Sequence, residues 1–558
     1  MNGTGSQFDV IIIGGGPAGS ILGSLLAQRG RSCLVLERDI HPRDHVGESL
    51  TPSTNPIFKQ IGFLEKIEAA GFVHKPGACW TAPRAPAGKF VAIRLGDFPP
   101  PDATQQYTYN VERDVFDAML IRHAHELGAR VIQGAGAQQV LFERDRAVGV
   151  RARLADGAHH DFYGRFVIDA SGRRCVLANQ LGFKHKDPEF DQVAMYSWFK
   201  GVAPNPPGYE GFLFLHFLGL ERAWAWQIPL RDGVCSIGVV THRSDFKRAE
   251  QSPDEFFASL VDRSVSFAHV MQGAERIRPW WLEGDYSYRI DRLAGDGWLI
   301  VGDALRFIDP IFSTGVDVAA YSAQFAFEAL EEALSGGDEA PAWATYERRV
   351  SDGVDVWYQF TSLFYKLQNL FTLFAVRERY REQVVRILQG NPYMPESLER
   401  AREMISLMQE SYGTVMRQPG SLLRPGALNG TGHLSATVAV DALVASVLGP
   451  GGATDPAWRE AAYQRGRAFA RGASEAEART IGRLPAPVAQ LVFDLARTPH
   501  GITDEGFEAL YAAGYSAESL LEITFAAAVG TGVERRTLGM EAIEAWEATT
   551  GNREATAR

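Results

Sequence analysis

The sequence predicts an α/β fold with an inserted antiparallel sheet and a helical C-terminal region. An apolar run from Val10 to Ile13 ends in the turn GGGPAG, and a helical pattern and a second apolar run from Cys33 to Leu36 follow. From Ala194 to Thr241 the hydrophobic period changes to the two-residue alternation of strands, and beyond Gly336 it becomes helical. These three observations define the parts of the expected architecture.

The first strand, turn, helix and second strand form a dinucleotide-binding fingerprint. Gly14 allows the turn, Gly16 lets backbone N–H groups approach a pyrophosphate, and Gly19 lets the helix pack against the sheet. The helix N-terminus adds unpaired donors and the positive end of its dipole. Glu37 closes the second strand about 20 residues further on, where its carboxylate can bind a ribose hydroxyl. We therefore expect this turn, including Ala18, and Glu37 to bind the cofactor.

Length and composition exclude several function classes. At 558 residues the chain exceeds what one hydrophobic core usually holds, so two or three domains are expected. A hydrophobic share of 46% with 22% charged residues is typical of a globular protein. The net charge of −11, without any basic block, argues against partners such as nucleic acid or an anionic membrane.

The cysteines and the apolar segments indicate the compartment. Four cysteines are scattered without the spacing of a metal site, so we expect no metal and reduced, mostly buried thiols: Cys33, Cys79, Cys175 and Cys235. No apolar segment reaches about 18 residues, and MNGTGSQF lacks the pattern of a signal peptide. The sequence therefore predicts a cytoplasmic protein.

Three regions follow from these patterns. Residues 1–350 are expected to form the nucleotide-binding core, with the antiparallel sheet inserted at about residues 190–290. Residues 351–417 read as a helical extension packed on that core. A Pro/Gly-rich linker from Gln418 to His433 then separates residues 434–558, a C-terminal helical domain whose role the sequence leaves open.

Helices and strands can be placed within these regions. The core is expected to contain a helix over Ser53–Ala70 capped at Thr51 or Ser53, a strand running into a helix over Tyr107–Gly128, a strand over Ala129–Val140, an antiparallel meander over Ala194–Thr241, and a strand at Trp298 leading to a helix over Val316–Glu332. In the extension, seven apolar residues fall on one helix face: Phe360, Leu363, Phe364, Leu367, Leu370, Phe371 and Phe374. That face either packs on the core or lines a substrate cleft or dimer contact.

Three motifs in chain order resemble the FAD-binding pattern of class A flavoprotein monooxygenases. They are GGGPAG with Glu37, VERDVFDAML around Arg113, and Gly302-Asp303. The resemblance implies that Arg113 places a fixed cation near the flavin phosphates, which suits a guanidinium, and that Asp303 binds ribityl hydroxyls. It also implies their hydroxylase-type fold, a Rossmann-like FAD-binding domain with an inserted sheet. Taken alone, Arg113 would be a surface residue and Asp303 a turn residue.

A fourth motif narrows the family. The segment WAWQIP from Trp224 to Pro229 resembles the WxWxIP signature of flavin-dependent halogenases. Alternation places Trp224, Trp226 and Ile228 on one face of a strand, and Pro229 ends its pairing. On that resemblance, the two indoles partition the flavin from the organic substrate. The alternative is a pair of core tryptophans in a sheet.

Lys75 is the catalytic residue that the resemblance implies. It lies in HKPGACW, after GESLTP, at a position similar to that of the halogenases' essential lysine. Hypohalous acid made at the flavin would be presented there to the substrate, either hydrogen-bonded to an ammonium or as a haloamine. The alternative is a solvated surface charge, the usual state of a lysine.

The loop DPIFSTG resembles the halide site of these enzymes at Ser313-Thr314-Gly315. Backbone N–H groups of Thr314 and Gly315 would bind chloride or bromide without a competing carboxylate. Tryptophan halogenases carry a glutamate at the position of Phe312, so their proposed carboxylate base is missing here. The chain is therefore more similar to the phenol- and pyrrole-type halogenases, whose electron-rich rings react without that help. The alternative role of Phe312 is packing in a wall.

The segment Gly47-Glu48-Ser49 resembles a loop that contacts flavin in this group. The alternative for Glu48 is a cap on the following helix. Both interpretations stay open at the level of sequence.

Together these motifs predict an FADH2-dependent halogenase that uses O2 and chloride or bromide. A separate flavin reductase is expected as partner, because no second nucleotide-binding fingerprint is visible. The expected substrate is a phenol or pyrrole, free or tethered to a carrier protein, in natural-product biosynthesis. The alternatives are an FAD-dependent aromatic hydroxylase or ene-reductase of the same fold, and a flavin-binding protein without turnover.

Overall fold

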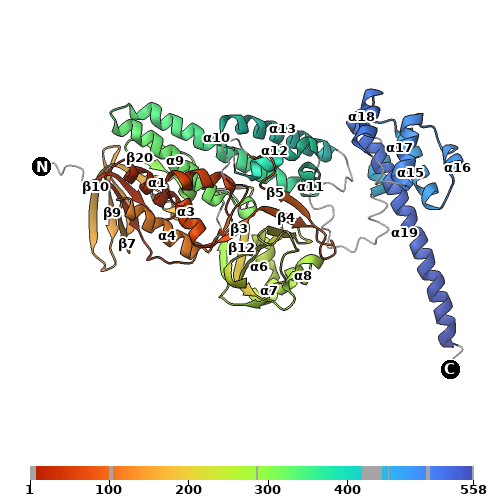
Figure 1. Cartoon of the computed structure of the whole chain (residues 1–558), viewed down its shortest axis with the longest axis horizontal. Coiled ribbons are helices and arrows are strands. Elements are labelled where there is room, and N and C mark those ends of the chain that lie inside the picture. Colours follow the sequence, from red (N-terminus) through yellow and green to blue (C-terminus); the bar gives the residue numbers. More distant parts are fainter. Residues whose placement is uncertain are drawn as a thin grey trace. The chain divides into compact units, whose positions relative to one another are not determined.

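The computed structural model divides into two compact units, Met1–Glu410 and Ser411–Arg558. The structure describes residues 8–99, 105–284, 287–376, 378–390, 392–417, 443–449, 451–497 and 503–555. The predicted linker therefore lies outside the described residues. Figure 1 shows the first unit with its two large sheets and the helices that cover them.

A sheet with the order β19-β20-β10-β1-β2-β7 organises the first unit, and all of these pairs are parallel except β19 with β20. The second strand pairs with the first over Val10–Ile13, and all four residues are buried because helices cover the sheet. The helices α1 (Pro17–Gln28), α4 (Arg113–Glu126) and α9 (Gly315–Leu334) pack beside it (Figure 1). Its strands are β1 (Phe8–Ile13), β2 (Cys33–Glu37), β7 (Arg130–Gln133), β10 (His159–Asp169), β19 (Ala294–Gly295) and β20 (Trp298–Ile300), and β8 (Gly136–Glu143) and β9 (Arg146–Arg153) extend it.

The inserted sheet has the order β16-β12-β15-β14-β13-β4-β5. Its strands are β4 (Gly77–Thr81), β5 (Val91–Arg94), β12 (Gln192–Lys200), β13 (Leu213–Phe217), β14 (Trp224–Pro229), β15 (Cys235–His242) and β16 (Glu275–Arg276), with β17 (Trp281–Gly284) also paired to β12. The predicted meander is right for β13, β14 and β15, whose connections are short. It is wrong for β12, because a meander would place β12 next to β13, whereas β12 pairs with β15 at the other end of the three strands. The place beside β13 is taken by β4, which pairs with it in parallel.

One face of this sheet is closed by three short helices. Those helices are α6 (Arg243–Ala249), α7 (Pro253–Val261) and α8 (Val265–Met271). Ala225 and Ile237 of the sheet form a buried cluster with Phe256, Leu260 and Phe267 of the helices. Because side chains alternate along a strand, the neighbours of Ala225 point to the opposite face.

Two predicted elements are each broken at a glycine. The single helix expected over Ser53–Ala70 is wrong: the segment holds the 3-10 turn η1 (Pro52–Thr54), α2 (Asn55–Gln60) and α3 (Leu64–Ala69), separated near Gly62, whose φ is +74°. The strand over Ala129–Val140 is likewise divided into β7 and β8 near Gly134, with φ of +73°. The strand-to-helix prediction at Tyr107–Gly128 is confirmed as β6 (Thr108–Asn110) and α4, and the helix over Val316–Glu332 as α9.

Smaller elements complete the core. The short strand β3 (Val73–Lys75) pairs antiparallel with β6. A three-stranded sheet joins β11 (Lys184–Lys186), β18 (Tyr288–Ile290) and β21 (Arg306–Phe307). The remaining turns and helix are η2 (Gly172–Arg174), α5 (Val176–Leu181), η3 (Arg231–Gly233), η4 (Gly302–Ala304) and η5 (Pro310–Phe312). The four cysteines are buried free thiols, as expected.

The helical extension packs its apolar face inward. It comprises α10 (Glu339–Lys366), α11 (Gln368–Val376), α12 (Glu378–Leu388) and α13 (Pro395–Arg417). The aromatic stripe does not lie on one helix, because the chain breaks at Leu367 between α10 and α11. Phe360, Leu363, Phe364, Leu367, Phe371 and Phe374 are nevertheless buried; the side chain of Leu370 lies outside the described set.

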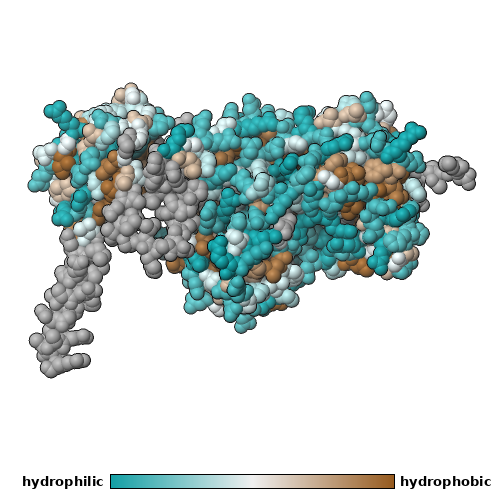
Figure 2. All heavy atoms as spheres, turned by 180° about the vertical axis from the view of Figure 1, so that it is seen from behind, coloured by the Kyte–Doolittle hydropathy of each residue, from teal (hydrophilic) through white to brown (hydrophobic). Residues whose placement is uncertain are grey.

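The second unit is helical in its described part. Its labelled helices are α15 (Pro456–Ala470), α16 (Glu475–Arg479), α17 (Ala486–Arg497), α18 (Asp504–Ala512) and α19 (Ala517–Ala555). Ala462, Val488, Val492 and Ile523 belong to its core, and buried Glu534 pairs with Arg467 and Arg471. Among the described residues, no helix combines the length and hydrophobicity needed to cross a membrane. On the face shown in Figure 2, hydrophilic residues predominate and hydrophobic ones form separate patches.

A buried carboxyl group joins three segments of the first unit. Asp317, in the first turn of α9, accepts hydrogen bonds from Thr51 Oγ1 (3.2 Å), Ser53 Oγ and Trp357 Nε1 (3.2 Å). The hydroxyls expected to cap a helix at Thr51 or Ser53 bind this carboxyl group instead, and neither residue makes a side-chain cap. This network fixes the start of α9 against the chain that leads from Leu50.

We expect the free energy of unfolding to reflect the burial of Asp317. Burial raises the pKa of Asp317 to about 7 from 3.8, although its three hydrogen-bond donors oppose the shift. The folded state therefore holds this proton more tightly, and stability falls as the pH rises from about 4 to about 7. Asp317→Asn imitates the protonated group, so its melting temperature relative to wild type should increase by about 2 °C or more between pH 5 and pH 8. An equal difference at both pH values would contradict this assignment.

Candidate active site

A cavity of about 470 Å³ lies between the two sheets of the first unit, within the usual range for ligand sites. Thirteen of the sixteen predicted site residues line it: Gly14, Gly16, Ala18, Glu37, Gly47, Glu48, Ser49, Arg113, Trp224, Trp226, Asp303, Thr314 and Gly315. Gly19, Gly302 and Lys75 lie outside the lining. Residues far apart in sequence are thus brought to one cavity.

The glycine turn leaves backbone exposed to the cavity. Gly14 has φ of +106°, and a Cβ there would lie 2.4 Å from the Ala170 carbonyl oxygen. A Cβ on Gly19 would lie 2.0 Å from the Gly14 carbonyl oxygen, so α1 packs against the turn as predicted. At Gly16 the nearest atom to such a Cβ is Arg43 Nη2 at 3.8 Å. The cavity therefore reaches the backbone where α1 begins, and its N–H groups can bind an anion.

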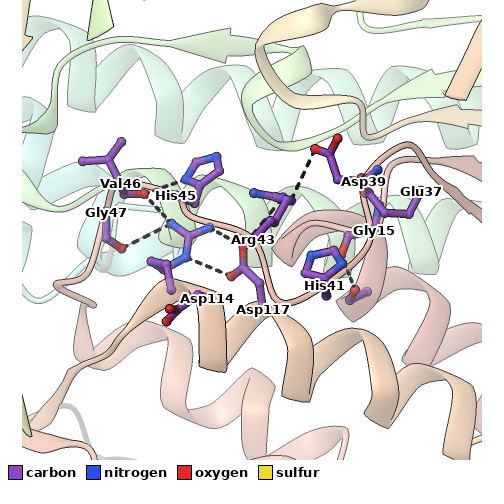
Figure 3. Close-up of polar contacts among 12 residues, drawn as sticks. Gly15, Glu37, Asp39, His41, Arg43, His45, Val46, Gly47, Asp114 and Asp117 are labelled. Atoms are coloured by element: carbon purple, nitrogen blue, oxygen red, sulfur yellow. Dashed lines mark hydrogen bonds and ion pairs between the residues drawn. The ribbon is translucent and has the colours of Figure 1, made fainter. Parts of the chain in front are cut away.

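Glu37 closes the turn from the second strand. Its Oε2 accepts a hydrogen bond from the Gly15 N–H at 2.6 Å, and its Oε1 accepts one from the Asp39 N–H at 2.8 Å (Figure 3). Each carboxylate oxygen keeps further lone pairs, and the side chain lines the cavity. The carboxylate is therefore fixed in position and able to accept a hydrogen bond from a sugar hydroxyl.

Arg113 is a buried, fully held cation at the start of α4. Its Nε and Nη2 donate to Asp117 at 2.9 and 3.0 Å, and its Nη1 donates to the Val46 carbonyl oxygen at 2.8 Å. Burial acts to lower its pKa, but the paired Asp117 raises it above the ordinary value. Figure 3 shows Val46, Gly47 and Asp117 around this contact. The guanidinium thus stays charged beside the cavity.

Arg43 is a cavity residue that the sequence analysis missed. Its Nε is buried without a hydrogen-bond partner in the described part of the chain, and its Nη2 lies 3.8 Å from Asp117 Oδ2. Figure 3 shows it between Asp39 and Asp117. Since Arg43 also faces Gly16, a cation stands beside the turn that precedes α1. The available signal was its place in the turn-rich loop that follows the Glu37 strand.

Two carboxyl groups in the cavity wall, those of Asp303 and Glu48, have raised pKa values. Burial raises the pKa of Asp303 to about 6, while Arg113 and Arg173 act to lower it. Burial also raises the pKa of Glu48, whose carboxylate accepts hydrogen bonds from the Gly47 N–H and Trp198 Nε1. Glu48 therefore lines the cavity and does not cap the following helix.

The two indoles of β14 face the cavity together. Trp224, Trp226 and Ile228 line it, as the alternation predicts, and the two ring centroids lie 5.9 Å apart. Trp224 Nε1 donates to Tyr365 Oη at 2.8 Å, and Tyr365 Oη donates to Asp309 Oδ1 at 3.1 Å. Asp309 lies in the predicted halide loop, where burial raises its pKa to about 7. A polar chain missed in the sequence therefore joins this loop to the tryptophan wall.

The halide loop turns directly into α9. Ser313 has φ of +60°, a left-handed conformation that costs about 1–3 kcal/mol outside glycine. It reverses the chain so that Thr314 and Gly315 stand at the N-terminus of a 20-residue helix, whose first-turn N–H groups have no intrahelical acceptor. Both residues line the cavity. This arrangement fits a small anion.

Phe312 packs in an aromatic wall. Its ring centroid lies 5.0 Å from Phe360, 5.2 Å from Phe364 and 6.0 Å from Phe371. The structure therefore confirms the packing role and shows no carboxylate at this position. The apolar stripe of the helical extension covers this side of the halide loop.

Lys75 is buried at 4% exposure, and its Nζ donates to the Leu50 carbonyl oxygen at 2.7 Å. Burial lowers its pKa to about 7. The alternative of a solvated surface lysine is wrong. Leu50 directly follows Ser49 of the cavity wall, so the amine is held close to the cavity without lining it.

Comparisons with known proteins agree with this site. The FAD binding domain family matches residues 7–360. A 1H-pyrrole-2-carbonyl-peptidyl-carrier-protein chlorinase of Pseudomonas fluorescens is 38% identical over 423 residues, covering 72% of this chain and 94% of the relative. The corresponding brominase of Pseudoalteromonas luteoviolacea is 31% identical, covering 69% of this chain and 92% of the relative. The solved structure of the flavin-dependent brominase Bmp2 aligns with a TM-score of 0.66 at 28% identity, covering 73% of this chain and 99% of that one.

The glycine turn, the cavity residues Arg43 and Arg113, and the family match define an FAD-binding protein. Within that class, the chain belongs to the flavin-dependent halogenases. The predicted fold, the flavin cofactor and the halogenase assignment are therefore confirmed, and the hydroxylase, ene-reductase and non-catalytic alternatives are not supported.

The two arginines should separate cofactor binding from folding. Arg43→Met removes a cation whose two ion pairs, to Asp39 and Asp117, are both long at 3.8 Å. We therefore expect about tenfold weaker FAD binding, equivalent to about 1.4 kcal/mol, and little change in the melting temperature of the flavin-free protein. Arg113→Met leaves Asp117 buried without its partner and should destabilise the flavin-free protein by about 3–5 kcal/mol. Fluorescence titration of FAD and thermal melting measure the two effects. A large loss of stability in Arg43→Met would contradict its role.

Proposed function

We propose that this halogenase acts on an electron-rich aromatic ring of the pyrrole class that is held as a thioester on a carrier protein. Both similar relatives above carry that substrate in their names, and each is matched over more than nine-tenths of its length. Phe312 supports the proposal, because a ring that loses its proton readily needs no carboxylate base. The observation that carries the catalytic part is the buried amine of Lys75.

Reduced FAD supplies the chemistry that converts O2 and halide into hypohalous acid. Thr314 and Gly315 hold the halide at the N-terminus of α9, with Asp303 and Arg113 beside the same cavity. Trp224 and Trp226 wall off this region, so the oxidant meets halide before it meets organic substrate. A separate flavin reductase supplies the reduced cofactor, and the predicted cytoplasmic location fits that supply.

Lys75 captures the halogen as a neutral amine. Its lone pair attacks the halogen of HOX, the X–O bond breaks and water leaves with the amine proton. The aromatic carbon then takes the halogen, the N–X bond breaks, and the ring loses its proton while the amine is restored. Burial favours this uncharged form, and among the described residues no charged group acts on the pKa of Lys75. The Leu50 carbonyl accepts one N–H and leaves the lone pair available.

Removal of the amine should stop halogenation and spare flavin oxidation. With FAD, a reductase, halide and a panel of pyrrolyl and phenolic substrates, Lys75→Met should form at least about 100-fold less halogenated product, the loss usual for a group that acts in the chemical step. Mass spectrometry of the halogen isotope pattern measures product, and absorbance follows FADH2. Lys59→Met, an exposed lysine on α2, is the matched control. Product formation at the wild-type rate in Lys75→Met would reject the role of Lys75.

Carrier dependence is tested in the same assay. The pyrrolyl thioester on a carrier protein should be halogenated, whereas the free pyrrole acid should react much more slowly. Equal rates would reject tethering while leaving halogenation intact.

The pH dependence should follow Lys75. Because its pKa is lowered to about 7, the neutral amine dominates above that pH, and halogenation per FADH2 consumed should rise from pH 6 to pH 8. An unburied lysine would titrate at about 10.4. The pH profile is measured with bromide and with chloride, because HOBr and HOCl ionise at different pH values. A rise at the same pH with both halides therefore reflects a group of the protein. A fall in coupling through pH 7 would favour the ammonium form.

A further inference from the structure

Ser49 and Asn110 are two buried polar side chains that the mechanism above does not use. Ser49 is 6% exposed and lines the cavity, and Asn110 is fully buried. In the described part of the chain, Ser49 Oγ and Asn110 Oδ1 have no hydrogen-bond partner. An unpaired buried polar atom costs about 1–3 kcal/mol, so two such atoms close together need an explanation.

Strand pairing places both on the same face as Lys75. In the antiparallel pair of β3 and β6, Val73 lies opposite Asn110 and Lys75 opposite Thr108. Ser49 forms an antiparallel bridge with Asn110 from the other side of β6. Residues directly opposite share a face, and so do residues two apart on one strand. Ser49, Asn110, Thr108 and Lys75 therefore stand on one face, while His74 and Tyr109 stand on the other.

The bridge brings the two unpaired groups close together. The Leu50 N–H donates to the Tyr109 carbonyl and the Val111 N–H to the Glu48 carbonyl, so Ser49 and Asn110 form the closer, non-hydrogen-bonded type of pair. Their Cα atoms are then about 4.5 Å apart. Asn110 Nδ2 donates to the Gly211 carbonyl at 3.1 Å, which fixes the amide and directs Oδ1 away from that contact.

This face connects the cavity to the amine. Ser49 lies in the cavity wall, and Lys75 Nζ reaches back across β6 to the carbonyl of the next residue, Leu50. Ser49 and Lys75 lie on opposite sides of β6 and are offset by two residues along it. The distance between their Cα atoms is therefore about 12 Å. Thr108 already donates to the Thr51 carbonyl at 3.3 Å. The unpaired atoms of this face are thus those of Ser49 and Asn110.

We propose that Ser49 and Asn110 are positioning residues that pass hypohalous acid from the flavin cavity to Lys75. Hypohalous acid has one O–H donor and an acceptor oxygen, which match the Asn110 carbonyl and the Ser49 hydroxyl. No bond is made or broken at either residue; each holds the molecule by hydrogen bonds while the halogen stays on oxygen. The inference rests on the proposed function, because it needs an oxidant that travels to Lys75.

The test measures how much oxidant reaches the substrate. In Ser49→Ala, which removes a hydroxyl without a protein partner, halogenated product per FADH2 should fall about tenfold, the loss expected from about one hydrogen bond. With catalase present, halide-dependent oxidation of free methionine should rise correspondingly, because the acid escapes. Ser49→Thr should restore coupling, and Asn110→Leu should repeat the loss. Ser24→Ala, a buried serine of α1 that donates to the Ser20 carbonyl, is the control.

Two outcomes separate this inference from the proposed function. Wild-type protein that gives neither halogenated product nor halide-dependent methionine oxidation would reject the proposed function. Normal wild-type halogenation with unchanged coupling in both Ser49→Ala and Asn110→Leu would reject the inference alone. An activity-independent measurement is a crystal structure of the flavin-free protein. It should show an ordered water bonded to both Ser49 Oγ and Asn110 Oδ1 and lost in Ser49→Ala, and direct protein partners for both atoms would overturn the inference.

Discussion

The hydrogen bond from Lys75 Nζ to the Leu50 carbonyl oxygen is the constraint on which the site depends. It ties β3 to the segment that brings Glu48 and Ser49 into the cavity, and it keeps the amine inside the protein. A buried amine is costly when charged, so the same burial lowers the pKa of Lys75 to about 7. The contact therefore fixes the position of the amine, and the burial of the amine disfavours its charged form. The rest of the first unit holds the flavin cavity beside that contact.

The parts of this site that sequence reasoning found are those whose chemistry is local. The glycine turn needs φ of +106° at Gly14 and no side chain at Gly19, and both requirements are visible in a few consecutive residues. The shared face of Trp224 and Trp226 follows from alternation within one strand. Lys75 was found through its family position, because nothing in its own spacing indicates that it is buried.

The parts that were missed depend on contacts between distant segments. Tyr365 of α10 binds Trp224 and Asp309 across 141 and 56 positions, and no periodicity encodes such a pair. The same physics explains the wrong cap at Thr51 and Ser53. Their hydroxyls suit a helix N-terminus, but they bind the buried carboxyl group of Asp317, which is costly to leave without donors. The sequence alone does not show whether these hydroxyls bind the helix N-terminus or a carboxyl group from a distant segment. The burial of Asp317 in the folded chain determines the outcome.

The aromatic side chain of Phe312 and the lowered pKa of Lys75 are two parts of the proposed mechanism. A carboxylate beside the substrate would attract a proton to the amine and raise its pKa, because opposite charges favour the charged form. Phe312 contributes no such charge, and its ring packs against Phe360 and Phe364. On the proposed function, such a site exchanges base catalysis at the ring for an amine whose lone pair is available near neutral pH. This exchange is favourable for a ring as electron-rich as pyrrole, and it would fail for a substrate that needs help to lose its proton.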